Sequence, residues 1–341
     1  MNNAPVIIPT LCRYEHFKNC IDSLRENDLA VDTELYIGID YPTKEAHRDG
    51  YNKIKDYVRK IDGFKQVHAY FHGKNLGSLA NTNFLLNEAG KNHENFIFSE
   101  DDNVFSKYFL HFINKHLTDI KDNDEIIGVC GYGYPFLSQF GVITLSQSVA
   151  FSAWGYGMWF KDRAVIGNYI EQGLLLKKMQ SGEIRKKVNN KSPFNYELLM
   201  SACRAYPPDT CWEYFNFTDF AVSSYMLIEG KKIIMPSKTL VRNCGWDNSG
   251  EHCSEDDQRE KRQVLQYDYP NQPMCSENEN PTGGIVDLDS EMVHMWKLYT
   301  LEKGISIRFI KHKIREQLFL LCGQKNYYKV KKFLHSFHKK K

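Results

Sequence analysis

The chain has 341 residues, of which 42% are hydrophobic and 25% charged, as in an ordinary globular protein. Its nine cysteines form no C-x-x-C pair, which argues against a disulfide framework or a zinc ribbon, and no secretory signal pattern or apolar run of about 18 residues occurs, so we expect a cytoplasmic protein. The net charge of +2 conceals a basic end, since residues 304–341 hold 11 Lys and Arg against one acidic residue, Glu316.

The first 130 residues predict strands and helices in alternation. The strands are short and apolar, and the helices carry apolar residues three and four positions apart. We predict strands over 5–9, 34–39, 66–71 and 95–99, and helices over 16–26, 43–61 and 79–89. Such alternation indicates an α/β fold with a mostly parallel central sheet and flanking helices. Ligands of these sheets bind at the carboxyl ends of the strands.

The rest of the chain is less regular. Residues 126–245 mix short strands with helices and contain aromatic, glycine-rich pieces. Residues 247–288 are polar and rich in Asn, Pro and Gly, which predicts a loop or linker. Beyond Glu291 the pattern is helical and basic.

Three consecutive acids, Glu100, Asp101 and Asp102, directly follow the strand predicted at 95–99. Mg²⁺ and Mn²⁺ bind one or two carboxylates together with phosphate oxygens and water, and such a cation neutralises a diphosphate leaving group. The alternative is a solvated acidic turn in which an Asp caps the next helix. The position at the end of a strand favours the metal site.

These acids resemble the DxD-type metal motif of GT-A glycosyltransferases, and they are especially similar to bacterial polysaccharide enzymes related to the N-acetylglucosaminyltransferase I group. Four further segments resemble the same family in the same order. They are the opening strand and helix with Pro9, Thr10 and Arg13; an N-x-G loop with Asn75, Gly77 and Asn81; an aromatic segment from Phe151 to Trp159, with Tyr156 where Trp is usual; and an N-x-G…H segment with Asn243, Gly245 and His252.

The resemblance implies a GT-A domain over 1–255, with a nucleotide-sugar-binding half at 1–130 and an acceptor-side half at 131–255. A loop or linker at 256–290 and a helical basic extension at 291–341 would follow. Asp102 would bind Mn²⁺ or Mg²⁺, with Glu100 and Asp101 near the ribose, the sugar or metal-bound water. The remaining candidate contacts to the nucleotide sugar are Pro9, Thr10, Arg13, Asp40, Asn75, Gly77, Asn81, Trp154 and Gly155.

An inverting transfer, which the resemblance implies, needs a general base for the acceptor hydroxyl. Asp219 is the first candidate, although it is equally suited to the N-terminus of the apolar helix that follows it. Glu213 is the competing base. His252 would complete the metal shell, with an exposed loop histidine as the alternative. Trp154 and Gly155 suit a sugar contact or a packing role.

The basic end carries Ile307, Ile310, Ile314 and Leu318 at helical spacing with cations between them. This pattern predicts a helix on an anionic membrane surface. A helix packed on the body with a solvated basic face is the alternative, and a nucleic-acid partner is disfavoured because the body is acidic.

The predicted function is metal-dependent transfer of a hexose or N-acetylhexosamine from a UDP-sugar to a glycan or lipid-linked acceptor. The setting would be bacterial surface polysaccharide synthesis, in the cytoplasm or peripherally on the inner membrane. One alternative is a catalytically inactive carbohydrate-binding or scaffold protein at the membrane. The other, a sugar nucleotidyltransferase, would need a glycine-rich loop after the first strand, and residues 10–14 contain no glycine.

Overall fold

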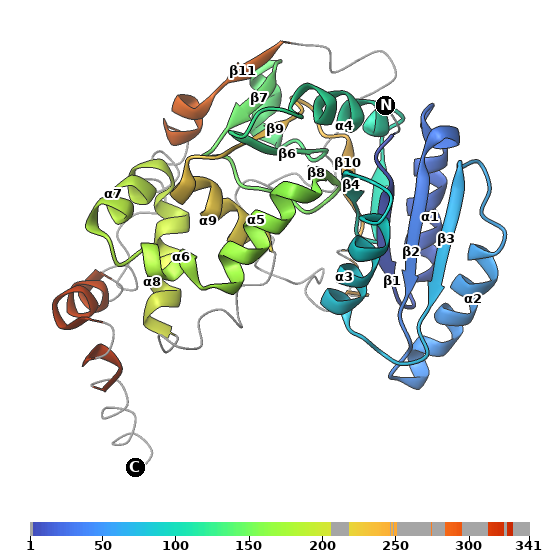
Figure 1. Cartoon of the computed structure of the whole chain (residues 1–341), viewed down its shortest axis with the longest axis horizontal. Coiled ribbons are helices and arrows are strands. Elements are labelled where there is room, and N and C mark those ends of the chain that lie inside the picture. Colours follow the sequence, from blue (N-terminus) through green and yellow to red (C-terminus); the bar gives the residue numbers. More distant parts are fainter. Residues whose placement is uncertain are drawn as a thin grey trace. The chain divides into compact units, whose positions relative to one another are not determined.

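The computed structural model describes residues 3–205, 218–245, 247, 249–250, 274, 284–294, 313–323 and 326–329 (Figure 1). The chain divides into two compact units, each built from three separate segments. The first unit comprises Met1–Leu145, Ser152–Arg163 and Ile233–Asp287, and the second comprises Ser146–Phe151, Ala164–Lys232 and Leu288–Lys341. The predicted division at residues 130, 255 and 290 stays a prediction.

A nine-stranded sheet in the order β11-β7-β9-β6-β8-β4-β1-β2-β3 organises the first unit. Its strands are β1 (Val6–Thr10), β2 (Glu34–Ile39), β3 (Gln66–Phe71), β4 (Asn95–Phe98), β6 (Ile126–Cys130), β7 (Ile143–Ser146), β8 (Tyr156–Trp159), β9 (Lys232–Met235) and β11 (Ile285–Asp287). Strand β1 runs parallel to β2 and β4, β2 to β3, and β7 to β11, whereas β8 is antiparallel to β4 and β6. The predicted α/β class with a mostly parallel sheet is confirmed.

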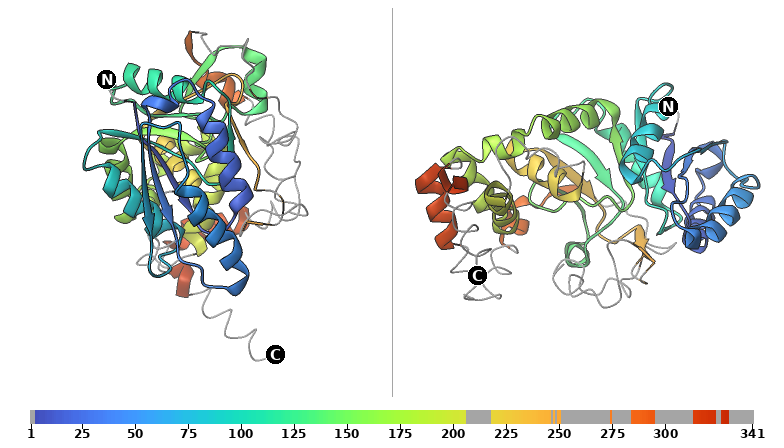
Figure 2. Two further views of the ribbon diagram at one scale, coloured as in Figure 1. Left: turned by 90° about the vertical axis from the view of Figure 1, so that its right-hand side faces the viewer. Right: turned by 90° about the horizontal axis from the view of Figure 1, so that it is seen from below.

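Helices cover both faces of the sheet in this unit. The α-helices are α1 (Tyr14–Arg25), α2 (Arg48–Val58), α3 (Ser78–Ala89) and α4 (Phe109–Asp119), and short 3-10 turns occupy η1 (Ala30–Asp32), η2 (Glu45–His47) and η3 (Pro135–Phe140). Helices α1 and α2 pack together on one face of β1–β3, and α3 lies on the other (Figures 1 and 2). Helix α4 approaches β8 closely because Gly157 has no side chain there; a Cβ would lie 2.4 Å from Ile113.

A second, two-stranded sheet positions the acidic triplet. Strand β5 (Asn103–Phe105) begins immediately after Asp102 and pairs antiparallel with β10 (Val241–Asn243). In this register Asn103 lies opposite Asn243. The pairing therefore brings the residues after β10 to the triplet from about 140 positions away in the sequence.

The second unit is helical. It contains most of α5 (Phe160–Glu171), then α6 (Leu174–Lys178), α7 (Gly182–Lys191), α8 (Pro193–Ala205) and α9 (Asp219–Glu229), and helical residues at 289–294, 313–323 and 326–329. Buried Asp289 accepts hydrogen bonds from the Ser146 hydroxyl and the Ser148 backbone N–H, both at 3.0 Å, and pairs with Lys191. Among the described helices, none is long and apolar enough to cross a membrane.

The predicted strands and helices of the first 100 residues are confirmed, with small shifts at their ends. Predicting residues 247–288 as a loop was wrong at β11, where Ile285 and Val286 form an exposed strand beside β7. Both are β-branched, which suits a pleated edge, but three residues are too few to produce a periodic signal. Most of the linker predicted at 256–290 lies outside the described residues.

Candidate functional site

The acidic triplet lies where two neighbouring strands of the main sheet end. Strands β1 and β4 pair in parallel, so Thr10 at the end of β1 lies beside the residues that follow β4. Arg13 directly precedes α1 and completes this edge. The site is thus built at the carboxyl ends of parallel strands, where ligands bind in such sheets.

Protein side chains contact both carboxylate oxygens of Asp101. It is 6% exposed; Thr10 donates its hydroxyl hydrogen to Oδ2 at 2.8 Å, and the Arg13 guanidinium pairs with Oδ1. Burial raises the pKa of Asp101, and the nearby guanidinium offsets that effect only in part. Asp101 therefore anchors Arg13 and the loop.

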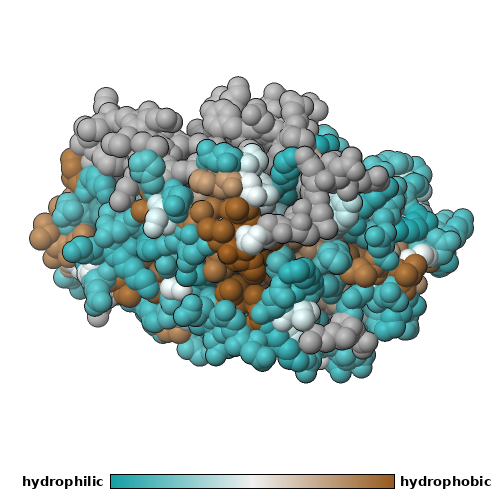
Figure 3. Space-filling model, turned by 90° about the horizontal axis from the view of Figure 1, so that it is seen from above, coloured by the Kyte–Doolittle hydropathy of each residue, from teal (hydrophilic) through white to brown (hydrophobic). Residues whose placement is uncertain are grey.

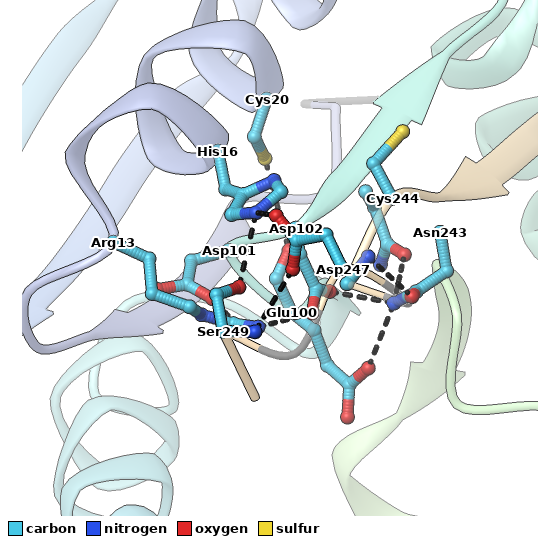
Figure 4. A network of polar contacts seen from close by, with 12 residues as sticks. Arg13, His16, Cys20, Glu100, Asp101, Asp102, Asn243, Cys244, Asp247 and Ser249 are labelled. Atoms are coloured by element: carbon cyan, nitrogen blue, oxygen red, sulfur yellow. Dashed lines mark hydrogen bonds and ion pairs between the residues drawn. The ribbon is translucent and has the colours of Figure 1, made fainter. Parts of the chain in front are cut away.

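Asp102 is the second carboxylate that contacts Arg13. Its Oδ2 lies 2.7 Å from Arg13 Nη1, and its Oδ1 accepts a hydrogen bond from the side-chain amide of Asn243 at 2.5 Å (Figure 4). Burial acts to lower the pKa of Arg13, but Asp101 and Asp102 together raise it above its ordinary value. One permanently charged guanidinium thus holds two adjacent carboxylates in fixed positions.

Asn243, the last residue of β10, and Gly245 just after it complete this arrangement. The Gly245 N–H donates to Asn243 Oδ1 at 3.0 Å, which turns the Asn243 amide hydrogens toward Asp102 and, at 3.4 Å, Glu100. A Cβ on Gly245 would lie 2.2 Å from Asp102 Oδ2. Only glycine allows the backbone to approach the carboxylate this closely.

A second group of contacts joins α1 to the segment after β10. His16 Nε2 lies 2.9 Å from Asp247 Oδ2 and 3.2 Å from Ser249 Oγ (Figure 4). Burial acts to raise the pKa of Asp247, but hydrogen bonds from Ser249 and His16 outweigh it and lower the pKa to about 2. Sequence reasoning missed His16, because one histidine on an amphipathic helix carries no distinguishing pattern.

The predicted nucleotide-side residues form an internal network at the ends of β2 and α3. Asp40 is buried and accepts the backbone N–H groups of Leu76 and Gly77, each at 2.8 Å. It also accepts its neighbour's N–H and the side chain of Asn75, so each carboxylate oxygen receives two donors. Asp40 therefore holds the 75–77 loop in place, while buried Asn81 donates to the Gly38 carbonyl at 2.9 Å.

From Ser152 onward, the aromatic segment belongs to the first unit. The half-buried Trp154 ring lies edge-on to Tyr132, with 5.0 Å between centroids. Gly155 has φ of +70°, and a Cβ there would lie 2.9 Å from Val241 and 3.0 Å from Phe105. This glycine is thus required by both its backbone conformation and the small sheet beside it. Pro9 lies within β1, opposite Gly38 of β2.

Of Asp219, Glu213 and His252, only Asp219 lies within the residues that the structure describes. Asp219 belongs to the second unit, is exposed and is the first residue of α9; Thr218 caps that helix by accepting the Ala221 N–H. The position of Asp219 at a helix N-terminus, one of the two roles considered for it, is confirmed. Glu213 and His252 lie outside the described residues.

A divalent cation fits the acidic triplet only if a bound phosphate supplies further oxygen ligands. Within the described residues no three His, Cys, Asp or Glu side chains are grouped to hold a metal ion by themselves. Asp102 nevertheless accepts one hydrogen bond or ion pair on each oxygen, which leaves further lone pairs. Because Mg²⁺ and Mn²⁺ use few carboxylates when phosphate oxygens are present, Asp102 fits a cation that is shared with a bound diphosphate.

No family model matches the sequence, and no curated protein matches it. Similar solved structures include the mannosyltransferase PcManGT from Pyrobaculum calidifontis in complex with GDP-Man and Mn²⁺ (13% identity, TM-score 0.35, 47% of this chain and 45% of that one). S. aureus TarS has 10% identity and a TM-score of 0.37 over 92% of this chain and 48% of that one. Mouse xyloside xylosyltransferase 1 has 11% identity and a TM-score of 0.28 over 47% of this chain and 68% of that one.

The chain thus spans about half the length of the first two structures. With TM-scores below 0.5, these similarities do not indicate what activity this chain has.

Proposed function

We propose that this protein is a metal-dependent glycosyltransferase that moves a hexose or N-acetylhexosamine from a nucleotide-diphosphate sugar to a hydroxyl acceptor. The observation that carries the proposal is the acidic triplet at the carboxyl ends of β1 and β4, in which Asp101 and Asp102 pair with Arg13. A donor of this class needs a site for a diphosphate and a cation, and both bind well at such an edge.

The contacts of Asp102, Arg13 and Asn243 suggest a different role for each residue. Asp102 would hold Mn²⁺ or Mg²⁺, which neutralises the negative charge of the departing diphosphate when bound. Arg13 keeps the Asp102 carboxylate in position, and Asn243 fixes its other oxygen. Because Arg13 and Asn243 hold both oxygens of the carboxylate, it would need little reorganisation to bind the cation.

The nucleotide side would be shaped by the Asp40-bound loop. Asp40 fixes the N–H groups of Leu76 and Gly77, and Asn75 is tied to the Tyr41 carbonyl at 2.7 Å. The resulting turn leads into the N-terminus of α3 at Ser78. Pro9, Thr10 and Asn81 support the same edge from β1 and α3, while Trp154 and Gly155 remain candidates for a sugar contact.

The finer parts of the proposal rest on the motif resemblance. They are a UDP-linked donor, an inverting reaction with Asp219 or Glu213 as the base, His252 in the metal shell, and a glycan or lipid-linked acceptor in bacterial surface polysaccharide synthesis. A peripheral position on the cytoplasmic side of the inner membrane belongs to the same set.

The test is UDP release from a panel of UDP-sugars, with Mn²⁺ and with EDTA. We expect release from one donor that depends on the metal, and a loss of about 100-fold or more in Asp102→Asn. Asp124→Asn is the matched control, because this side chain is 90% exposed on the same unit. Absence of release from every donor, together with absence of metal-dependent UDP binding, would instead support an inactive carbohydrate-binding protein.

A further inference from the structure

One side of helix 313–323 packs against the rest of the second unit, to which the helix belongs. Glu316 is 3% exposed and accepts hydrogen bonds from the Tyr196 hydroxyl of α8 at 2.5 Å and from Lys313 at 3.0 Å. Phe319, three residues further along, is also 3% exposed and lies edge-on to Tyr327. Glu316 and Phe319 therefore mark the side of the helix that faces the second unit.

The other side of this helix is apolar and exposed. Ile314, Leu318 and Leu321 are 56%, 49% and 82% exposed, and their spacing of four and three residues aligns them in one stripe. Of the ten large hydrophobic residues exposed in the described part of the chain, these three share one 11-residue helix. The face shown in Figure 3 is mostly hydrophilic around a hydrophobic patch near its middle.

A surface helix normally buries its apolar stripe and exposes its polar side. Here the packed side contains a buried glutamate, and the exposed side contains isoleucine and leucines. Burying a carboxylate is costly, and this one is compensated by Tyr196 and Lys313. These bonds fix the rotation of the helix and keep the stripe pointing away from the unit.

The sequence segment that contains the stripe is strongly basic. Residues 304–341 contain 11 Lys and Arg and one acidic residue, Glu316. Because Glu316 is buried and bound, it presents no negative charge to an approaching surface. Arg315, next to Ile314 in the sequence, is exposed.

We propose that Ile314, Leu318 and Leu321 dock this protein on the surface of an anionic lipid bilayer. The stripe would enter the boundary between headgroups and acyl chains, and the exposed Arg315 and the other basic residues of this sequence segment would bind the lipid phosphates. Nucleic acid shares the anionic chemistry but offers no apolar layer for the two leucines. The proposal rests on the peripheral membrane position included in the proposed function, but it needs no residue of the acidic triplet, so either can fail without the other.

The experiment is co-sedimentation of the full chain with vesicles of phosphatidylcholine alone or mixed with phosphatidylglycerol. The variant Ile314→Gln/Leu318→Gln/Leu321→Gln removes the stripe and keeps helix-compatible side chains. Val31→Gln/Val165→Gln/Leu198→Gln is the matched control, because these residues are 63%, 57% and 40% exposed elsewhere on the chain. Thermal unfolding of each variant verifies that the fold is retained.

We expect the wild type to bind the anionic vesicles, with binding weakened by added salt, and the stripe variant to bind at least about tenfold more weakly. The control variant should bind as the wild type does. Equal binding of the stripe variant and the wild type would overturn the proposal, as would failure of the wild type to bind anionic vesicles. A wild-type dimer that becomes monomeric in the stripe variant would assign the stripe to a second copy of the chain instead.

Discussion

Replacing Gly245 with alanine tests whether the position of the Asp102 carboxylate matters. The new Cβ would lie 2.2 Å from Asp102 Oδ2 and 3.2 Å from Arg13 Nη1. Relief of the first contact requires a shift of about 1 Å, since non-bonded carbon and oxygen atoms rarely approach within roughly 3.2 Å. The carboxylate cannot rotate away freely, because Arg13 and Asn243 hold its two oxygens.

The expected effect follows from the contacts that such a shift breaks. A hydrogen bond to a charged group contributes about 1.5–3 kcal/mol, and two are weakened together, so we expect a loss of about 2–4 kcal/mol in unfolding free energy. A displacement of about 1 Å at a reacting group lowers turnover roughly 100-fold. Metal-dependent UDP release and urea unfolding measure the two effects separately.

Gly250→Ala is the matched control for this substitution. Its Cβ would lie 3.5 Å from Arg13 Nη1 and 3.6 Å from the Gly245 carbonyl oxygen, which are ordinary contact distances. Turnover and stability of this variant should stay within about twofold and about 0.5 kcal/mol of the wild type. If Gly245→Ala behaved like Gly250→Ala, the argument that Asp102 is held rigidly would be refuted.

Three further predictions concern other residues. Asp40→Asn should lower the unfolding free energy in urea by about 2–4 kcal/mol, because an amide cannot accept all four donors that the carboxylate accepts. Burial acts to raise the pKa of Glu34, but hydrogen bonds from one lysine and two histidines lower it from 4.5 to about 2. The stability that Glu34 adds over a Glu34→Gln variant is therefore present above about pH 4.5 and should disappear as the pH falls toward 2 in urea titrations. Thr218→Ala should lower the unfolding free energy by about 1 kcal/mol, because the Ala221 N–H loses its cap. If Asp219 is the base, Asp219→Asn should lower transfer to an acceptor at least about 100-fold and leave UDP binding unchanged. Transfer rates and UDP affinity measured on both variants distinguish the two roles.

The fold of the first 100 residues is predictable from the sequence because its signals are local. Each of β1 to β4 is short and largely apolar, and each intervening helix repeats apolar residues at three and four positions. Helix α1, for example, buries four such residues: Phe17, Cys20, Ile21 and Leu24. The edge strand β11 lacks that signal, since three residues are too few to show a period.

The candidate site is only partly predictable. The triplet is contiguous and follows a strand, so its position at the edge of the sheet can be inferred. The role of Gly245 cannot, because it depends on the distance to a carboxylate that is far away in the sequence. Asp40 shows the reverse case: its type and position suggest a ligand contact, but all its acceptor positions serve the adjoining loop.

The pairing of β5 with β10 also sets the order in which the site is assembled during synthesis. Asp102 emerges 141 residues before Asn243, an interval of roughly 7–30 s at ordinary rates of translation. Until then a nascent chain carries Arg13 and the acids but neither the amide that fixes Asp102 nor the glycine beside it. The intervening residues include most of the helical second unit, which is made before the first unit can close. The arrangement around Asp102 is therefore complete only after Gly245 has been made, and a shorter translation product would keep the contacts to Arg13 but lack those of Asn243 and Gly245.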